Sequence, residues 1–419
     1  MLSEQRATLI TYFAFLAIVA SAGVLIVFAH RGIAPCLLAM GLIAAFAPTL
    51  WQDGKRALYA GIGQKAPQGL LFLILFGMTL WIAITALWSP IGGAAKLAVN
   101  VLVPALSSYA VIWRLGRFNS SHQAGLITAF IGAVVFAAVF LLIEALSGGA
   151  LRDIIPPKDQ SPERFKDMTA LGRGMTILTL LVFPAMVLVW QRMRAFWVCL
   201  VLFAISLIAA ANLTIAANTG ALLVGGVSFL IAMVRPRLAV RLSVFTIIAL
   251  ILATPLLALL PADQLMASLG ERLPPSWHQR LAIWEASGQA IQACLPLGCG
   301  ADYARSLKET WQMIEIPGSP ILVSAMPTHP HQLFMQLWME LGLPGVLIAL
   351  SGVVISGRFI LSARQLPNQV IAAGVAVLAI FTFSSLVEAS LWQVWRLCAL
   401  GFAFLGIALS YFINQTNVQ

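Results

Sequence analysis

The sequence predicts an all-α polytopic membrane protein with about twelve transmembrane helices. Of its 419 residues, 60% are hydrophobic and only 10% are charged, and the mean hydropathy is +0.94. A soluble domain has about 25% charged residues and needs a polar surface. The apolar runs are continuous and roughly twenty residues long, which is the length of a helix that crosses a bilayer. This composition argues against a soluble enzyme, a nucleic-acid-binding domain and a disordered chain.

Twelve apolar segments are long enough to be candidate spans. They lie near 9–28, 33–50, 70–88, 97–113, 125–146, 175–190, 195–211, 214–234, 240–260, 332–357, 369–387 and 391–412. The first has no small-residue cleavage site followed by a polar region, so we expect a retained helix. Three regions follow: 1–260 with spans one to nine, a large outer loop at 261–331, and 332–419 with the last three spans.

The basic residues predict the orientation. With the N-terminus in the cytoplasm and alternating spans, the inner segments hold thirteen Lys and Arg residues against two acids, Glu4 and Asp53. The short outer loops hold only Arg31 and Lys96. This asymmetry follows the positive-inside rule and predicts cytoplasmic N- and C-termini. It also explains most of the net charge of +10 without a nucleic-acid partner.

Two long outer loops carry basic residues that the rule does not explain. Loop 147–174 contains Arg164 and Arg173, and loop 261–331 contains Arg280 together with His278, His329 and His331. One interpretation is a pair of solvated loops, balanced by their own acidic residues. The other is a binding site for a lipid-linked phosphate or pyrophosphate. Charge alone leaves both open.

The larger loop has features of an ordered structure. Residues 277–294 and 302–314 have the periodicity of amphipathic helices, and structureless loops of this length are uncommon. Cys294 and Cys299 flank a Leu-Pro-Leu-Gly turn. An oxidising compartment permits a disulfide there, but the geometry decides whether one forms.

The segment that enters the tenth span is rich in special residues. Pro330 keeps His329 out of the helical conformation, so a helix is expected to begin near His331, at the membrane boundary. Gly342 and Gly345 allow a break or the close approach of another helix.

Three ionisable residues lie deeper in the spans. Glu340 is expected to be paired, because an isolated charge in a membrane is costly. The expected partner is Arg396, the only basic residue of the last span, and Glu388 is expected to be solvated near an outer helix end.

These motifs together resemble a known family. The run His331-Gln332, followed after nine residues by Gly342-Leu-Pro-Gly345, resembles the signature of bacterial O-antigen ligases. Arg280-Leu-Ala-Ile-Trp284 and Pro296-Leu-Gly-Cys-Gly300 look like the other half of the pattern. O-antigen polymerases and O-linked oligosaccharyltransferases share it. The resemblance implies a GT-C-like fold with a large periplasmic loop between spans nine and ten.

One segment departs from the family pattern. Many members have a Ser-Arg-Gly-like turn in a mid-chain span, whose Arg is thought to serve the donor phosphate. The nearest segment here is Asn218-Thr219-Gly220-Ala221, with Thr219 in place of the Arg. Either another base substitutes, with Arg164 and Arg173 the best candidates, or the segments do not correspond.

The resemblance implies an inverting glycosyl transfer at the periplasmic face of the inner membrane, without a metal or cofactor. The donor would be an undecaprenyl-pyrophosphate-linked O-antigen, and the acceptor a sugar hydroxyl of lipid A–core. Histidine suits proton transfer near neutral pH, and arginine suits a departing pyrophosphate. His331 is therefore the expected base and Arg280 the main pyrophosphate ligand. His329, Gln332 and Trp284 are expected to position them.

Other interpretations remain open. His331 is otherwise an interfacial residue at a helix start, and Arg280 a salt-bridge partner of Glu271 or Glu285. His329 is a second candidate base, and the histidines at 278, 329 and 331 are an alternative zinc site. The rival functions are an O-antigen polymerase, an O-linked oligosaccharyltransferase, and a transporter of lipid-linked sugar. A transporter is expected to have ionisable residues along the membrane interior, whereas in this sequence the ionisable residues cluster at the predicted outer face.

Overall fold

The computed structural model describes residues 2–47, 49–56, 67–154, 164–259, 264–265, 268, 275–307, 313–314, 323–324 and 328–416. The helices are α1 Leu2–Phe28, η1 His30–Gly32, α2 Ile33–Ala45, α4 Pro67–Thr85, α5 Lys96–Leu115, α6 Ser120–Ser147, α7 Ala150–Ile154, α8 Arg164–Met193, α9 Phe196–Asn212, α10 Ala217–Val234, α11 Pro236–Ala253, η2 Thr254–Leu259, α13 Pro275–Cys294, α14 Tyr303–Leu307, α15 Leu333–Ser362, α16 Asn368–Val387 and α17 Val394–Thr416. The short strands β1 Met313–Ile314 and β2 Val323–Ser324 pair antiparallel.

The prediction of a helical multi-pass membrane protein is confirmed. Within the described ranges, nine helices are long and apolar enough to cross a membrane. A tenth span results if the pair His30–Ala45 and Thr49–Arg56, bent by 93°, counts as one. The other two predicted spans are shorter apolar helices, Gly69–Thr85 and Phe196–Asn212. The described residues therefore support nine or ten full spans rather than the twelve predicted, because hydropathy does not show where a helix bends or stops short.

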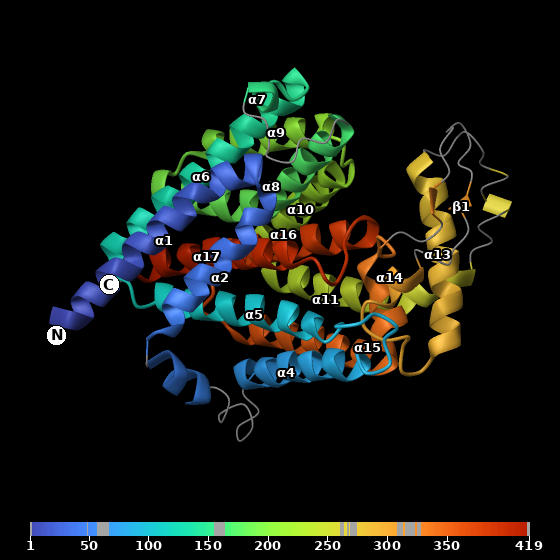
Figure 1. Ribbon diagram of the computed structural model, residues 1–419. Helices are drawn as coiled ribbons and strands as arrows, with labels where there is room; N and C mark the ends of the chain where they lie inside the picture. Colours follow the sequence, from blue (N-terminus) through green and yellow to red (C-terminus); the bar gives the residue numbers. More distant parts are fainter. Residues whose placement is uncertain are drawn as a thin grey trace.

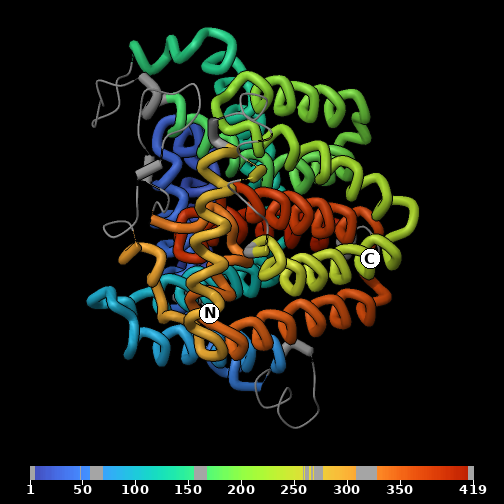
Figure 2. The backbone as a smooth tube through the Cα atoms, turned by 90° about the vertical axis from the view of Figure 1, so that its right-hand side faces the viewer, coloured from blue at the N-terminus to red at the C-terminus, as the bar shows by residue number. Residues whose placement is uncertain are grey.

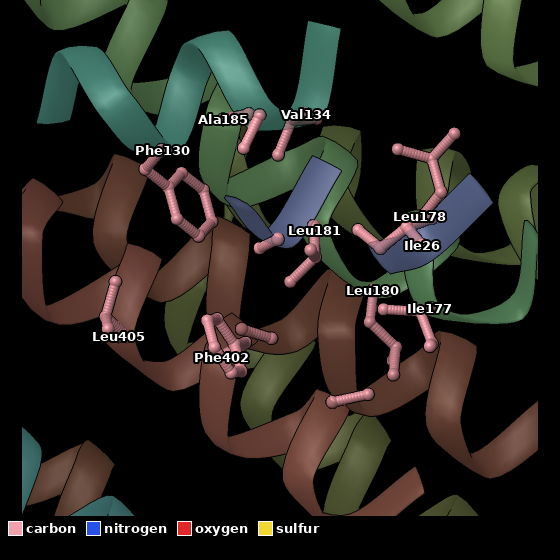
Figure 3. Close-up of a cluster of buried hydrophobic side chains, with 14 of the residues drawn as sticks. Ile26, Phe130, Val134, Ile177, Leu178, Leu180, Leu181, Ala185, Phe402 and Leu405 are labelled. Atoms are coloured by element: carbon pink, nitrogen blue, oxygen red, sulfur yellow. The ribbon is translucent and has the colours of Figure 1, made fainter. Parts of the chain in front are cut away.

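Helix α8 lies at the centre of the main core. Figure 3 shows Leu181 and Ala185 of α8 among Phe130 and Val134 of α6 and Phe402 of α17, all buried. Close packing of this kind holds helices together where lipid is as apolar as the side chains themselves.

A glycine brings α8 close to the end of α1. A Cβ atom added at Gly174 would overlap the carbonyl oxygen of Ile26. Small residues permit such backbone contacts between membrane helices. As a result α8 also contacts the turn η1, which follows α1, and Arg173 lies on this part of α8.

Helix α13 stands across one end of the bundle (Figure 1). The chain ends, marked N and C, lie towards the opposite end, and the view rotated by 90° shows α13 in front of the bundle (Figure 2). The expected helix at 277–294 is confirmed. The expected helix at 302–314 is wrong: α14 ends at Leu307, and Met313–Ile314 pair with β2 instead.

Candidate active site

The two halves of the sequence pattern interlock at a break in α15. Gly342 has φ 60° and ψ −162°, which interrupts the helix, one of the two alternatives that the sequence left open. A Cβ atom on Gly298 would lie 2.6 Å from the Gly342 nitrogen. The Leu343 N–H donates to the Pro296 carbonyl at 2.8 Å, and the Cys299 N–H donates to the Met339 carbonyl at 2.8 Å. The 296–300 turn therefore satisfies the backbone groups that the break exposes.

The same turn is closed by a disulfide between Cys294 and Cys299, whose Cα atoms lie 5.1 Å apart. This answers the question that the sequence left open. The bond joins the end of α13 to the turn that is hydrogen-bonded to α15. It therefore links α13 covalently to a turn that is held against α15.

Glu340 is the centre of a buried hydrogen-bond network. Its carboxylate accepts from the backbone N–H of Asp302 at 2.7 Å and of Ala304 at 3.4 Å. It also accepts from the Gln336 amide at 2.9 Å and the Trp392 indole at 2.7 Å. The side chain is fully buried. These donors compensate a carboxylate that would otherwise be costly in this position.

The expected pairing of Glu340 with Arg396 is therefore wrong. Arg396 forms an ion pair with Glu388 at 3.2 Å and donates to the Ser384 hydroxyl at 3.1 Å. Glu388 is not simply solvated, because its side chain is 18% exposed and bound to this cation. Similar depth in two spans does not show which way each side chain points.

The two histidines of the motif contact each other. The backbone N–H of His331 donates to Nδ1 of His329 at 3.2 Å, and the ring centroids lie 4.3 Å apart. His331 has φ 53°, so the chain is not yet helical there and α15 begins at Leu333, two residues later than expected. Gln332 caps the helix: its side chain accepts from the Met335 N–H and donates to Thr254 at 3.2 Å.

Both imidazoles are held in the neutral form. Burial, reinforced by Arg280, lowers the pKa of His331 to about 4. Burial also lowers the pKa of His329 to about 3, and charge repulsion contributes, since a proton on His329 would be disfavoured by a proton on His331 and by the cation of Arg396. A neutral imidazole has a lone pair that can accept a proton at neutral pH.

Arg280 lies on α13, near the end of α16. Its guanidinium donates to the Val387 carbonyl, from Nε at 3.4 Å and Nη2 at 3.2 Å, and lies 5.5 Å from the Trp277 ring centre. Burial lowers the pKa of Arg280, while Glu388 opposes the shift. Glu271, one of its alternative partners, lies outside the described residues.

Trp284, one turn further along α13, packs against a cluster that contains Met335 and Met339 of α15. It holds α13 against the helix that follows the histidines. This contact is consistent with the expected supporting position of Trp284.

A polar cavity of about 460 Å³ opens beside the histidine pair. Its lining includes Arg31, Arg173, Asp302, Arg305, Thr328, His329, Ser390, Trp392 and Gln393. Arg173 and His329 thus line the same cavity, whereas Arg280 and His331 are not among its lining residues. Its volume is in the range of small-molecule sites. Arg31, Arg305 and Trp392 were not singled out from the sequence. For Arg31 the available signal was its place in a short loop that the charge pattern predicts to lie outside.

The mid-chain segment without an Arg lies next to Arg173. Asn218 is buried, and its amide donates to the Gly172 carbonyl at 2.8 Å and accepts from the Thr176 hydroxyl at 3.0 Å. Thr219 does not line the cavity. Arg164 is at the start of α8, but its side chain is outside the described residues.

The alternative zinc site gains no support from the geometry. In the part of the chain that the structure describes, which includes His278, His329 and His331, no three His, Cys, Asp or Glu side chains are grouped as metal ligands.

The fold and cavity define a multi-pass helical membrane protein with a basic site at one end of its bundle. Residues 214–350 match the model of the family described as O-antigen ligase. The match covers about a third of the chain, from the Asn218 segment through the first part of α15. It indicates a membrane enzyme of the O-antigen ligase or polymerase type. No curated protein matches the chain.

Proposed function

We propose that this protein is an O-antigen ligase. It transfers O-antigen from undecaprenyl pyrophosphate to a sugar hydroxyl of lipid A–core. The observation that carries the proposal is the contact between His331 and His329, which lines a basic cavity, within the segment that matches the family.

The periplasmic face of the inner membrane is the proposed location of the reaction. The basic residues favour cytoplasmic termini, and α13 stands at the end of the bundle opposite the termini (Figure 1). A cysteine-labelling experiment tests this orientation: an introduced cysteine at Gln289, which is exposed on α13, is expected to react with an impermeant maleimide added to spheroplasts. A cysteine at Arg237 is expected to be protected.

His331 is the better candidate for the base, and His329 positions it. Nδ1 of His329 accepts the His331 N–H, so the remaining nitrogen of a neutral His329 carries its proton and has no lone pair to use. The ring of His331 keeps one unprotonated nitrogen. This asymmetry supports assigning proton transfer to His331.

In the proposed step, the acceptor hydroxyl oxygen attacks the anomeric carbon while the bond from that carbon to the pyrophosphate oxygen breaks. The hydroxyl proton moves to His331, and the electron pair of the broken bond leaves with the pyrophosphate. Arg280 and Arg173 stabilise the negative charge that develops on the leaving group. A single displacement inverts the anomeric configuration.

The test uses purified protein in detergent with lipid-linked O-antigen, isolated lipid A–core and EDTA. His331→Asn is expected to lower the transfer rate about 10²–10⁴-fold, and Arg280→Ala about 10²–10³-fold. The matched control is His329→Asn, whose amide oxygen can still accept the His331 N–H. It is expected to retain most of the activity.

The outcomes separate the alternatives. Full activity of His331→Asn would contradict the assignment of the base. A wild-type protein that ignores lipid A–core and lengthens the lipid-linked donor would be a polymerase. Transfer to protein would indicate an oligosaccharyltransferase, and movement of intact donor across vesicles without transfer would indicate a transporter.

A further inference from the structure

Two tryptophans and a glutamine of the cavity lining come from the connection between α16 and α17 or from the first turn of α17. They are Trp392, Gln393 and Trp395. The indole N–H of Trp392 donates to Glu340, so its ring adds apolar surface to the cavity rather than a donor. The ring of Trp395 packs edge-on against the buried ring of His30, with centroids 5.5 Å apart. Both tryptophans are half-buried and held from behind.

Gln393 has a buried amide oxygen without a partner. Among the described residues, no donor reaches its Oε1 atom. Buried acceptors are nearly always hydrogen-bonded, so an orphaned one in a cavity lining points to a ligand that donates. Asp302 adds a second acceptor to the same lining. One of its oxygens is bound to Arg305 at 2.9 Å, and a carboxylate has further lone pairs.

The connection between the helices is fixed before any ligand binds. The Leu391 N–H donates to the side-chain oxygen of Gln336 at 3.0 Å, and Gln336 donates to Glu340. The Trp392 N–H donates to the Ser390 hydroxyl at 3.3 Å. A lining that is already ordered loses little conformational entropy on binding, which favours a recognition role.

The chemistry of these groups fits a sugar ring. An ionised phosphate offers only acceptors to Gln393 and is repelled by the carboxylate of Asp302. A lipid chain has no hydrogen-bond donor at all. A sugar has hydroxyl groups that donate to both acceptors, and an aliphatic C–H face that packs on the electron-rich face of an aromatic ring.

We propose that Trp392, Trp395 and Gln393 form a sugar subsite that holds one ring of an oligosaccharide substrate, with Asp302 as a further hydroxyl acceptor. The inference rests on the proposed function, because it assigns residues that recognise the sugar portion of its substrates. The core acceptor and the O-antigen donor both present such rings, and the test separates the two sources.

The test measures binding rather than transfer, by saturation-transfer NMR on the full-length protein in detergent. The two probes are core oligosaccharide and O-antigen polysaccharide, neither of which carries a lipid. Gln393→Leu is expected to weaken binding of one probe about three- to tenfold, through the lost hydrogen bond. Trp395→Leu is expected to weaken it by a similar factor, through the lost aromatic face.

Matched controls carry the same replacements away from the cavity. They are Gln289→Leu on the exposed side of α13 and Trp197→Leu on the exposed side of α9, and both are expected to bind like the wild type. The melting temperature without sugar is expected to be unchanged or raised in Gln393→Leu, since a buried unpaired oxygen is removed. This variant therefore decides the test even if Trp395→Leu fails to fold.

The outcomes distinguish the sources and the alternatives. Weaker binding of core oligosaccharide supports a subsite for the acceptor ring, and weaker binding of O-antigen supports one for the donor ring. The inference would be overturned if wild type bound neither probe, if Gln393→Leu bound both like the wild type, or if its loss of binding came with a lower melting temperature. A wild type that binds sugar in this way but transfers nothing to lipid A–core would count against the proposed function and leave the subsite standing.

Discussion

The indole N–H of Trp392 donates to the carboxylate of Glu340 at 2.7 Å. Trp392 lines the basic cavity, whereas Glu340 lies inside α15 and also binds the backbone at Asp302. Through these two hydrogen bonds, Glu340 connects α15 to Trp392 and to Asp302, which both line the cavity.

Replacing Glu340 is expected to loosen this part of the site. In Glu340→Gln, an amide NH₂ would face N–H donors, and leaving such a buried donor unpaired costs about 1–3 kcal/mol. Thermal unfolding in detergent is expected to show a lower melting temperature, and transfer is expected to fall. Glu285→Gln, on the partly exposed side of α13, serves as the control. Equal melting temperatures for the two variants would contradict the role of the network.

The break in α15 is expected to be intolerant of any side chain. Gly342→Ala adds a methyl group at a positive φ, against the backbone of Gly298. The strain alone is of order 1–3 kcal/mol, so we expect reduced expression and a lower melting temperature. Gly374→Ala, in a helix with no atom near the added carbon, is expected to be neutral or slightly stabilising. A neutral Gly342→Ala would show that the two motif halves are not interlocked in this way.

The low pKa of His331 makes a prediction about pH. The acid limb of kcat/KM, which reports groups of the free enzyme, is expected near pH 4 rather than near 6.5. Between these values the unfolded chain takes up a proton that the folded protein does not. The free energy of unfolding is therefore expected to decrease as the pH falls from 6.5 to 4. A limb at pH 6.5 would mean that the histidine is more exposed to solvent than the structure has it.

The disulfide is expected to stabilise α13 against the bundle. Closing the short loop from Cys294 to Cys299 is worth roughly 2 kcal/mol by the chain-entropy estimate. Reduction, or Cys294→Ser, should lower the melting temperature, while Cys36→Ser should not. Alkylation of the unfolded, non-reduced protein provides the check on the bond itself. Of the five cysteines, Cys36, Cys199 and Cys398 should be modified, and modification of all five would contradict the bond.

Local sequence features were sufficient for much of the fold. The long apolar runs, the helix at 277–294 and the break at Gly342 depend on composition and on single residues, so a linear reading finds them. The same reading failed for 302–314, where pairing with β2 takes the backbone groups that a helix would use. It also failed for His331, whose positive φ delays the start of α15.

The sequence by itself determined the class of protein, because hydropathy and chain length decide whether helices are long enough to cross a bilayer. It also indicated the histidine pair and the two halves of the motif around it. Only the tertiary structure decided which charges meet. Arg31, Arg173 and Arg305 come from segments far apart in the chain. Glu340 binds Trp392 rather than the expected Arg396, and Glu388, expected to be solvated, pairs with Arg396. The rotation and close packing of helices against one another determine these contacts, and no local pattern of residues encodes them.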